Sequence, residues 1–337
     1  MSTHNICALI YGNQKHYLDH LAPLASYLSV PLIVTEIEIE SLATKYYPDL
    51  DVVYLEPTSM PQKVVSSFET VISCLPKALF KSIFFITEAL SQKELKNVWC
   101  PHGNSDKGHF SPFMEGLSDE KWAFVYGKKM VSFLKEKSAH NQLENLFYLG
   151  NYRYEYFKKH REFYQKILNE TLLFQNNHQT LLYAPTWNDS ESSSSFDLEV
   201  NSLIDSLPPH WNLIIKPHPH LKCEIDNYKE NLIVLKDFPP IYPLLDKMDV
   251  YLGDMSSIGY DFLTFRRPLF FYPPKNRTLN YDTHSHLMQC GTILPPSKNP
   301  FPIIEQTDQT PFSKIQDLVY NSVFETTQTI KKIYELR

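Results

Sequence analysis

Residues 101–108, PHGNSDKG, place a histidine directly after an apolar run. An imidazole with an ordinary pKa of about 6.5 can take a proton from a hydroxyl at neutral pH. Gly103 would let a ligand approach the backbone closely, and Asp106 would orient the ring of His102 or balance its charge. The segment therefore predicts a general base at His102. A tight turn that uses the histidine only as a hydrogen-bonding spacer is the alternative.

Residues 213–220, LIIKPHPH, leave an apolar run through a turn stiffened by proline. Because proline fixes φ, His218 has little conformational entropy to lose on binding a ligand, and Lys216 adds a positive charge that suits phosphate. His218 and His220 form half of a metal-binding pattern. Neither HExxH nor a matching acidic residue accompanies them, so no metal site is predicted. A turn histidine bonded to the backbone is the alternative reading of His218.

Residues 253–272, GDMSSIGYDFLTFRRPLFFY, read as a strand end, a turn and the start of a helix. The N–H groups at a helix N-terminus and the hydroxyls of Ser256 and Ser257 together suit a phosphate group. The same serines could simply cap the helix. Asp254 is either a binding residue or a turn residue, and Asp261 would support the loop from behind. The segment predicts an anion site.

Two further segments supply polar groups after strands. Residues 183–189, YAPTWND, carry the hydroxyl of Thr186, an indole and an amide, which either line a nucleotide pocket or pack a loop. Arg153, in residues 150–157 (GNYRYEYF), offers a planar fork for phosphate. A surface ion pair with a nearby glutamate is the alternative for Arg153. The chain lacks GxGxxG, GxxxxGK followed by Ser or Thr, and GxSxG, which removes support for a classical NAD enzyme, a P-loop NTPase or an α/β-hydrolase.

The elements that must position these groups alternate between strand and helix. Apolar runs of strand length recur in both halves of the chain, at residues 5–11, 31–35, 51–55, 70–74, 98–101, 122–126, 180–184, 212–216, 232–235, 250–253 and 269–272. Such alternation predicts doubly wound α/β domains, whose ligand loops follow the carboxyl ends of parallel strands. Because 337 residues exceed the size of one core, we expect two Rossmann-like domains, 1–152 and 153–337, facing each other across a cleft. The second domain would end in a long amphipathic helix over residues 312–336.

Composition narrows the class of protein. A net charge of -6 argues against a general nucleic-acid binder. Five cysteines without a CxxC pair favour a reducing compartment over a disulfide framework. The chain shows neither a signal peptide nor a run of about 18 apolar residues, so we expect a cytoplasmic protein. Residues 79–86 are rich in apolar side chains, which leaves peripheral contact with the inner face of the cell membrane open.

The five segments, in this order, resemble the CDP-glycerol glycerophosphotransferase family, the group of teichoic-acid primases and polymerases. The resemblance covers about residues 98–273 and rests on PHGNSDKG, LGNYRYEYF, LLYAPTWND, LIIKPHPH and VYLGDMSSIGYDFLTFRRPLFFY. It implies a GT-B fold with an acceptor-side N-terminal domain and a C-terminal domain that binds the nucleotide donor.

The resemblance also implies a reaction. An acceptor hydroxyl would attack the β-phosphorus of CDP-glycerol without metal or cofactor, and CMP would leave. His102 matches the histidine proposed as the base, and His218 matches the one that engages the donor phosphates. Ser256 and Ser257 match the phosphate-binding serines. The expected partners are a CDP-linked donor and a glycan, polyol-phosphate or lipid-linked acceptor.

Four positions depart from the family pattern. Asn104 stands in place of threonine, Tyr152 of proline, Glu155 of aspartate and Asn188 of arginine. The main hypothesis is the transfer of glycerol phosphate or a related polyol phosphate, and these departures leave two alternative functions open. One is a GT-B glycosyltransferase or NDP-sugar epimerase that acts on a nucleotide sugar, and the other is a nucleotide-binding relative without catalysis.

Overall fold

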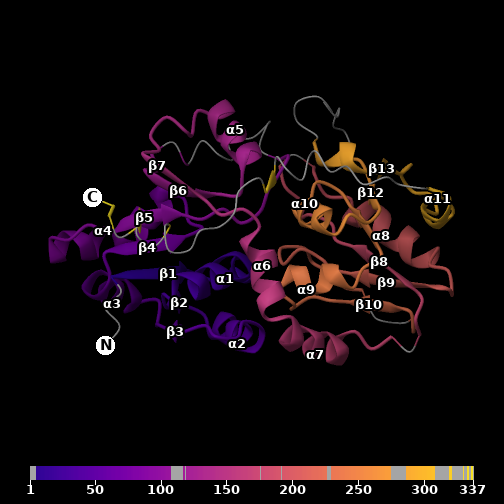
Figure 1. Ribbon diagram of the computed structural model, residues 1–337, viewed down its shortest axis with the longest axis horizontal. Coiled ribbons are helices and arrows are strands. Elements are labelled where there is room, and N and C mark those ends of the chain that lie inside the picture. The colour runs from indigo at the N-terminus through magenta and orange to yellow at the C-terminus, as the bar shows by residue number, and fades with distance from the viewer. Residues whose placement is uncertain are drawn as a thin grey trace. The chain divides into compact units, whose positions relative to one another are not determined.

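The computed structural model describes residues 5–107, 117, 119–174, 176–190, 192–225, 229–274, 286–307, 319, 320, 329, 332, 333, 335 and 336. The chain forms two compact units (Figure 1). Unit 1 comprises residues 1–102, 114–160 and 318–337, and unit 2 comprises residues 103–113 and 161–317. The chain therefore passes from unit 1 to unit 2 directly after His102, returns, and enters unit 2 again at Arg161.

The described part of unit 1 contains a seven-stranded parallel sheet in the order β3-β2-β1-β4-β5-β6-β7. Its strands are β1 (Ile6–Ile10), β2 (Leu32–Val34), β3 (Val52–Tyr54), β4 (Thr70–Ser73), β5 (Lys96–Trp99), β6 (Trp122–Val125) and β7 (Asn145–Tyr148). The sequence ICALI of β1 is buried throughout because helices cover both faces of a parallel sheet. The strand order reverses between β1 and β4, which is where loops of such sheets hold ligands.

The helical elements of unit 1 are η1 (Lys15–Tyr17), α1 (Leu18–Leu28), α2 (Ile37–Tyr46), α3 (Met60–Ser67), α4 (Lys77–Ser91), α5 (Lys128–Glu136) and α6 (Tyr152–Lys159). Helices α3 and α4 pack with β1 in one apolar core, to which Leu9, Val64, Phe80 and Phe84 belong. Burying one such side chain stabilises a fold by about 1.5–3 kcal/mol.

The described part of unit 2 contains a six-stranded parallel sheet in the order β10-β9-β8-β11-β12-β13. Its strands are β8 (Gln179–Tyr183), β9 (Trp211–Ile215), β10 (Leu232–Val234), β11 (Val250–Gly253), β12 (Leu269–Phe271) and β13 (Thr292–Ile293). Its helical elements are α7 (Arg161–Thr171), α8 (Phe196–Asp205), α9 (Ile241–Asp246), α10 (Ile258–Phe262), η3 (Leu263–Phe265), η4 (Leu287–Cys290) and α11 (Phe301–Gln306). The order reverses between β8 and β11, so the loops after these two strands lie beside each other.

Two parallel α/β units confirm the predicted Rossmann-like sheets. The division of the chain differs from the predicted boundary after residue 152, because α6 packs on α1 and so belongs to unit 1. The hydroxyl of Tyr152 donates to the carbonyl of His20 at 2.8 Å, and Arg153 forms an ion pair with Asp19 at 2.7 Å. The helix predicted over residues 312–336 lies mostly outside the described residues. The cleft between the two domains stays a prediction.

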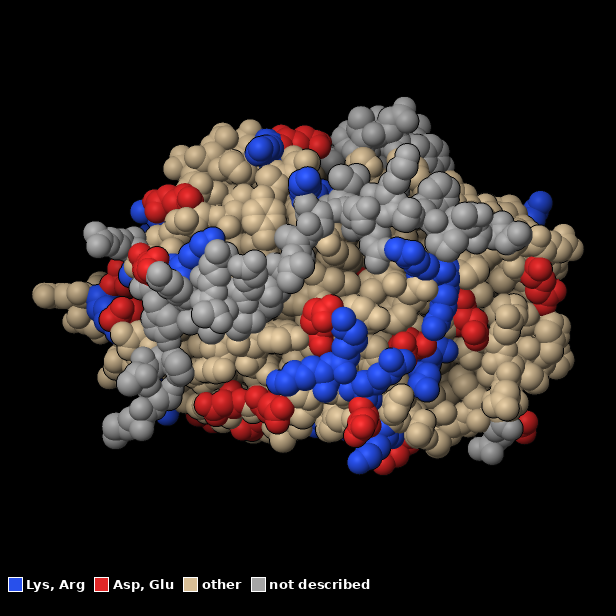
Figure 2. All heavy atoms as spheres, in the orientation of Figure 1, with Lys and Arg blue, Asp and Glu red and all other residues tan. Residues whose placement is uncertain are grey.

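Charged side chains of both signs are spread over the face drawn in Figure 2, and Lys and Arg gather in the area where Figure 1 draws α9. This mixed surface agrees with the small net charge of the chain. Within the described ranges, no helix combines the length and the apolar character needed to cross a bilayer.

The Arg153–Asp19 ion pair is buried, with the two side chains 3% and 10% exposed. Replacement of Arg153 by Met leaves the Asp19 carboxylate desolvated without its guanidinium, so the free energy of unfolding should fall by about 3–5 kcal/mol. The exposed ion pair between Arg161 and Asp246 is the matched control, and Arg161→Met should cost less than about 1 kcal/mol. Urea titrations followed by circular dichroism measure both changes. Equal losses in the two variants would contradict the structural role of Arg153.

Candidate functional site

His102 follows β5 at the carboxyl edge of the sheet of unit 1. The loop after β1 reaches the same edge and carries His16 and Tyr17 in η1. The ring centroid of His102 lies 5.0 Å from that of Tyr17 and 5.6 Å from that of His16. Because β1 and β5 are parallel and flank β4, their following loops meet, which places three titratable rings together.

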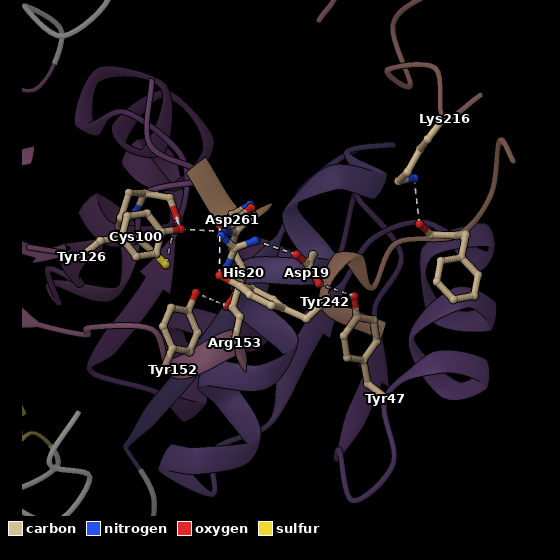
Figure 3. Close-up of polar contacts among 12 residues, drawn as sticks. Asp19, His20, Tyr47, Cys100, Tyr126, Tyr152, Arg153, Lys216, Tyr242 and Asp261 are labelled. Atoms are coloured by element: carbon tan, nitrogen blue, oxygen red, sulfur yellow. Dashed lines mark hydrogen bonds and ion pairs between the residues drawn. The ribbon is translucent and has the colours of Figure 1, made fainter. Parts of the chain in front are cut away.

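A buried hydrogen-bond chain holds the residue before His102. Nδ1 of His20 lies 2.6 Å from the hydroxyl of Tyr126, and this hydroxyl donates to the carbonyl of Pro101 at 3.2 Å (Figure 3). Burial lowers the pKa of His20 well below its ordinary value, and the charge of Arg153 lowers it further. His20 therefore stays neutral at physiological pH, and its role here is to position the backbone next to His102.

Arg153, predicted as a phosphate ligand, lies in unit 1. Its guanidinium pairs with Asp19 and stands 5.6 Å from the ring centre of Tyr126 (Figure 3). The hydroxyl of Tyr47 reaches the same carboxylate at 3.5 Å. The observed ion pair is thus a buried one with an aspartate of α1 rather than a surface pair with a glutamate.

Asp254 is the polar centre of unit 2. It follows β11, is completely buried, and accepts the amide hydrogens of Thr186 at 2.8 Å and Ser256 at 3.1 Å on Oδ1. Oδ2 accepts both the amide hydrogen and the hydroxyl of Ser195, at 2.8 and 3.0 Å. Burial raises the pKa of Asp254 to about 6, although these hydrogen bonds and the charge of Lys107 act in the opposite direction. One carboxylate therefore joins both ends of the loop between β8 and α8 to the loop that follows β11.

The two serines before α10 differ in their surroundings. Ser256 is buried, and its amide is used by Asp254. Ser257 is partly exposed and lies against Gly103, where an added Cβ would stand 2.8 Å from both Cβ and Oγ of Ser257. Gly103 has φ +127, so a larger side chain there would be strained as well as crowded. Since α10 has only five residues, any phosphate affinity here must come from side chains and local N–H groups rather than from a helix dipole.

Two buried aspartates, Asp106 and Asp261, anchor the segments around Ser257 through hydrogen bonds. Asp106 is 4% exposed and accepts hydrogen bonds from the hydroxyl of Tyr260 and, at 2.8 Å, from the amide of Leu287. These contacts hold residues 103–107 on unit 2. Asp261 is buried and accepts the hydroxyl hydrogen of Tyr242 at 3.1 Å, which ties α10 to α9.

The turn after β9 carries Lys216 and His218. Nζ of Lys216 is buried and donates to the carbonyl of Phe238 at 2.8 Å (Figure 3). Nδ1 of His218 accepts the amide hydrogen of His220 at 3.2 Å, as expected for a turn histidine. This bond selects the neutral tautomer that carries its proton on Nε2, which makes Nε2 a hydrogen-bond donor. The rings of His218 and His220 lie 6.3 and 5.8 Å from the half-exposed ring of Trp187.

The four departures from the family pattern have local roles. Tyr152 donates to the carbonyl of His20, as described above. Glu155 forms an ion pair with Lys158 at 2.7 Å along α6. Asn188 donates to Asp197 at 2.7 Å, and Asn104 is buried. Across the described residues, no three His, Cys, Asp or Glu side chains gather as metal ligands would.

A family model described as CDP-Glycerol:Poly(glycerophosphate) glycerophosphotransferase matches residues 114–295, more than half of the chain. The chain belongs to this family. Among curated relatives, it is 28% identical over 163 residues to a teichoic acid poly(glycerol phosphate) polymerase of Bacillus spizizenii, a match that covers 46% of this chain and 41% of the polymerase. It is 30% identical over 110 residues to a teichoic acid glycerol-phosphate primase of Bacillus subtilis, covering 32% of this chain and 29% of the primase. These matches thus span less than half of each relative.

Solved structures share the fold of this glycerophosphotransferase family member over nearly its whole length. The wall teichoic acid polymerase TagF superposes with a TM-score of 0.64 at 15% identity, covering 98% of this chain and 90% of that chain. A UDP-GlcNAc 2-epimerase from Neisseria meningitidis superposes with a TM-score of 0.59 at 11% identity, covering 98% and 100%. The predicted GT-B-like α/β class is confirmed. The fold is common to both enzymes, so it does not by itself choose between their reactions.

Several residues that shape these loops were not predicted from the sequence. His16 and Tyr17 contact the ring of His102, and Tyr126 donates to the carbonyl of Pro101. These residues were identifiable only through the parallel order of the strands. Lys107 was visible within PHGNSDKG, but its contact with Thr186 connects positions far apart in the sequence. Asp19 lacks any local motif.

Asp254 gives a pH-dependent stability that can be measured. Its pKa of about 6 in the folded chain exceeds its ordinary value of 3.8. Above about pH 6 the ionised carboxylate therefore lowers the free energy of unfolding by its full amount, and below the pKa of the unfolded chain this loss disappears. Relative to Asp254→Asn, the wild-type free energy of unfolding should therefore rise by on the order of 2 kcal/mol from pH 7 to pH 4.5. Urea titrations of both proteins across this range measure the difference. A difference that stays constant with pH would show that burial does not perturb this carboxyl group.

Proposed function

We propose that the chain transfers glycerol phosphate, or a related polyol phosphate, from a CDP-activated donor to an acceptor hydroxyl and releases CMP. The observation that carries this proposal is the family match over residues 114–295, which contain four of the five loop segments described above. The arrangement of these loops around Asp254 supports it, because a diphosphate needs several donors fixed in advance.

In this proposal His102 is the general base. Its imidazole takes the proton of the acceptor hydroxyl as the hydroxyl oxygen bonds to the β-phosphorus. The bond between this phosphorus and the bridging oxygen breaks, and the electron pair leaves with CMP. The ring contacts with His16 and Tyr17, and the bond from Tyr126 to Pro101, support the role by restricting how the His102 ring can turn.

Residues of unit 2 hold the donor in this proposal. His218 presents its Nε2 proton to the phosphates, with Ser257 and Thr186 as further hydroxyl donors. Lys216 adds positive charge next to them, and Asp254 positions the amides of Thr186 and Ser256. Because Arg153 is buried in its pair with Asp19, we assign it to the positioning of α6 rather than to phosphate.

Histidine replacements test the transfer. His102→Ala and His218→Ala should each lower the rate of CMP release from CDP-glycerol by about 100-fold or more, because a base or a phosphate donor is lost. His218→Ala should also weaken donor binding, whereas His102→Ala should not. His178, which is exposed directly before β8, is the control, and His178→Ala should keep the wild-type rate.

The same assay discriminates between donors. CDP-glycerol, CDP-ribitol and several UDP-sugars are incubated with the protein, and released CMP or UDP is quantified by chromatography. Release of UDP would favour the nucleotide-sugar reaction, and donor binding without any release would favour a non-catalytic relative. Wild-type CMP release by either histidine variant would exclude the assigned roles.

We further propose a cytoplasmic location with peripheral contact to the membrane through α4. Phe80 and Phe84 of this helix are buried in the core of unit 1. Four large apolar side chains of the same helix are exposed instead: Leu79 by 48%, Phe85 by 68%, Ile86 by 70% and Leu90 by 83%. Apolar side chains that protrude from a helix suit the boundary between lipid headgroups and acyl chains, where a lipid-linked acceptor would also lie.

Vesicle binding tests the role of α4. Replacing Phe85, Ile86 and Leu90 together by Ser should weaken binding to phosphatidylglycerol vesicles by about tenfold or more in a sedimentation assay, because their apolar surface leaves the lipid. Ile37 on α2 is 64% exposed, so Ile37→Ser is the matched control and should bind like the wild type. Absence of wild-type binding, or equal binding by the triple variant, would contradict the proposal.

A further inference from the structure

Lys107 lies among the donor-side loops of unit 2. Its Nζ donates to Oγ1 of Thr186 at 2.8 Å and lies 3.5 Å from Oδ2 of Asp189. The side chain is 16% exposed, and Nζ also stands 5.8 Å from the ring centre of Trp187. The lysine therefore brings a largely desolvated positive charge to the loop that follows β8.

The backbone that leads to Lys107 is fixed at several points. Gly103 lies against Ser257, and Asp106 is bound by Tyr260 and by the amide of Leu287. The amide of Lys107 itself donates to Oγ of Ser105 at 2.9 Å. Such fixation lowers the entropy that the lysine would lose on binding a ligand.

The other cations assigned to phosphate by sequence have different partners. Lys216 is bound to the carbonyl of Phe238, and Arg153 to Asp19 in unit 1. The charge of Lys107, by contrast, acts on Asp254, the carboxylate that positions the amides of Thr186 and Ser256. A diphosphate bound without metal needs nearby cations to stabilise its charge.

The contact with Asp189 is long for a charge-assisted hydrogen bond, which is about 2.7–2.9 Å when well formed. The bond to Thr186 is short. Lys107 can thus keep Thr186 while a stronger anion replaces Asp189. We propose that Lys107 is a further donor-binding residue, whose ammonium contacts the diphosphate of the nucleotide-linked substrate.

This inference rests on the proposed function and is tested on the full chain by calorimetry with CDP-glycerol, inorganic pyrophosphate and cytidine. Lys107→Met should lower the affinity for CDP-glycerol and for pyrophosphate about tenfold or more, and should change the affinity for cytidine less than about twofold. Lys107→Arg should recover most of the lost affinity because it keeps the charge. Lys236 also donates to a carbonyl of unit 2, so Lys236→Met is the matched control and should bind like the wild type.

Thr186→Val separates charge from support. If Lys107 only held Thr186 in place, this variant would lose as much pyrophosphate affinity as Lys107→Met; we expect a smaller loss. Equal loss of all three ligands in Lys107→Met, or no loss, would overturn the inference. If Lys107→Met releases CMP normally and binds pyrophosphate like the wild type, the inference about Lys107 is overturned and the proposed function stands. If pyrophosphate binding depends on Lys107 but no donor yields CMP, the proposed transfer reaction is refuted and the inference about Lys107 stands. If the wild type binds neither pyrophosphate nor CDP-glycerol, both the proposed function and the inference are refuted.

Discussion

One desolvated carboxylate organises the loops of unit 2. Asp254 accepts hydrogen bonds from Thr186 after β8, from Ser195 directly before α8 and from Ser256 before α10. Removing a carboxylate from water is costly, and here four hydrogen bonds offset only part of the cost, since the pKa of Asp254 stays above its ordinary value. The loops can therefore be held in one arrangement before any ligand binds, which is the condition under which fixed donors stabilise a developing charge.

The parallel sheets explain why these loops meet. In unit 2 the strand order reverses between β8 and β11, so YAPTWND and GDMSS leave neighbouring strands at the same edge. In unit 1 the same principle brings η1 to His102. The segment 103–107 begins directly after His102 in the chain and is anchored on unit 2 by Asp106. The likeness to both a polymerase and an epimerase shows that this framework accommodates different reactions.

The strands of the two sheets could be predicted from the sequence, whereas the hydrogen-bond and ion-pair partners of the polar residues could not. Strand β1 is a continuous apolar run and β9 is one apart from Asn212, and their burial on both faces makes them recognisable. Strand β13 has two half-buried residues and carries no such signal. The partner of Arg153 is Asp19, 134 residues away, and that of Lys107 is Thr186, 79 residues away. No local pattern encodes such pairs, which also explains why the boundary expected after residue 152 differs from the observed division.

The central claim is that the loops gathered around Asp254 hold a diphosphate so that a bond to phosphorus is broken. Phosphorus NMR of a reaction with CDP-glycerol and an acceptor polyol phosphate tests this most directly. The account predicts that CMP accumulates together with a new phosphodiester signal in the acceptor. Accumulation of CDP, with glycerol transferred without its phosphate, would contradict it.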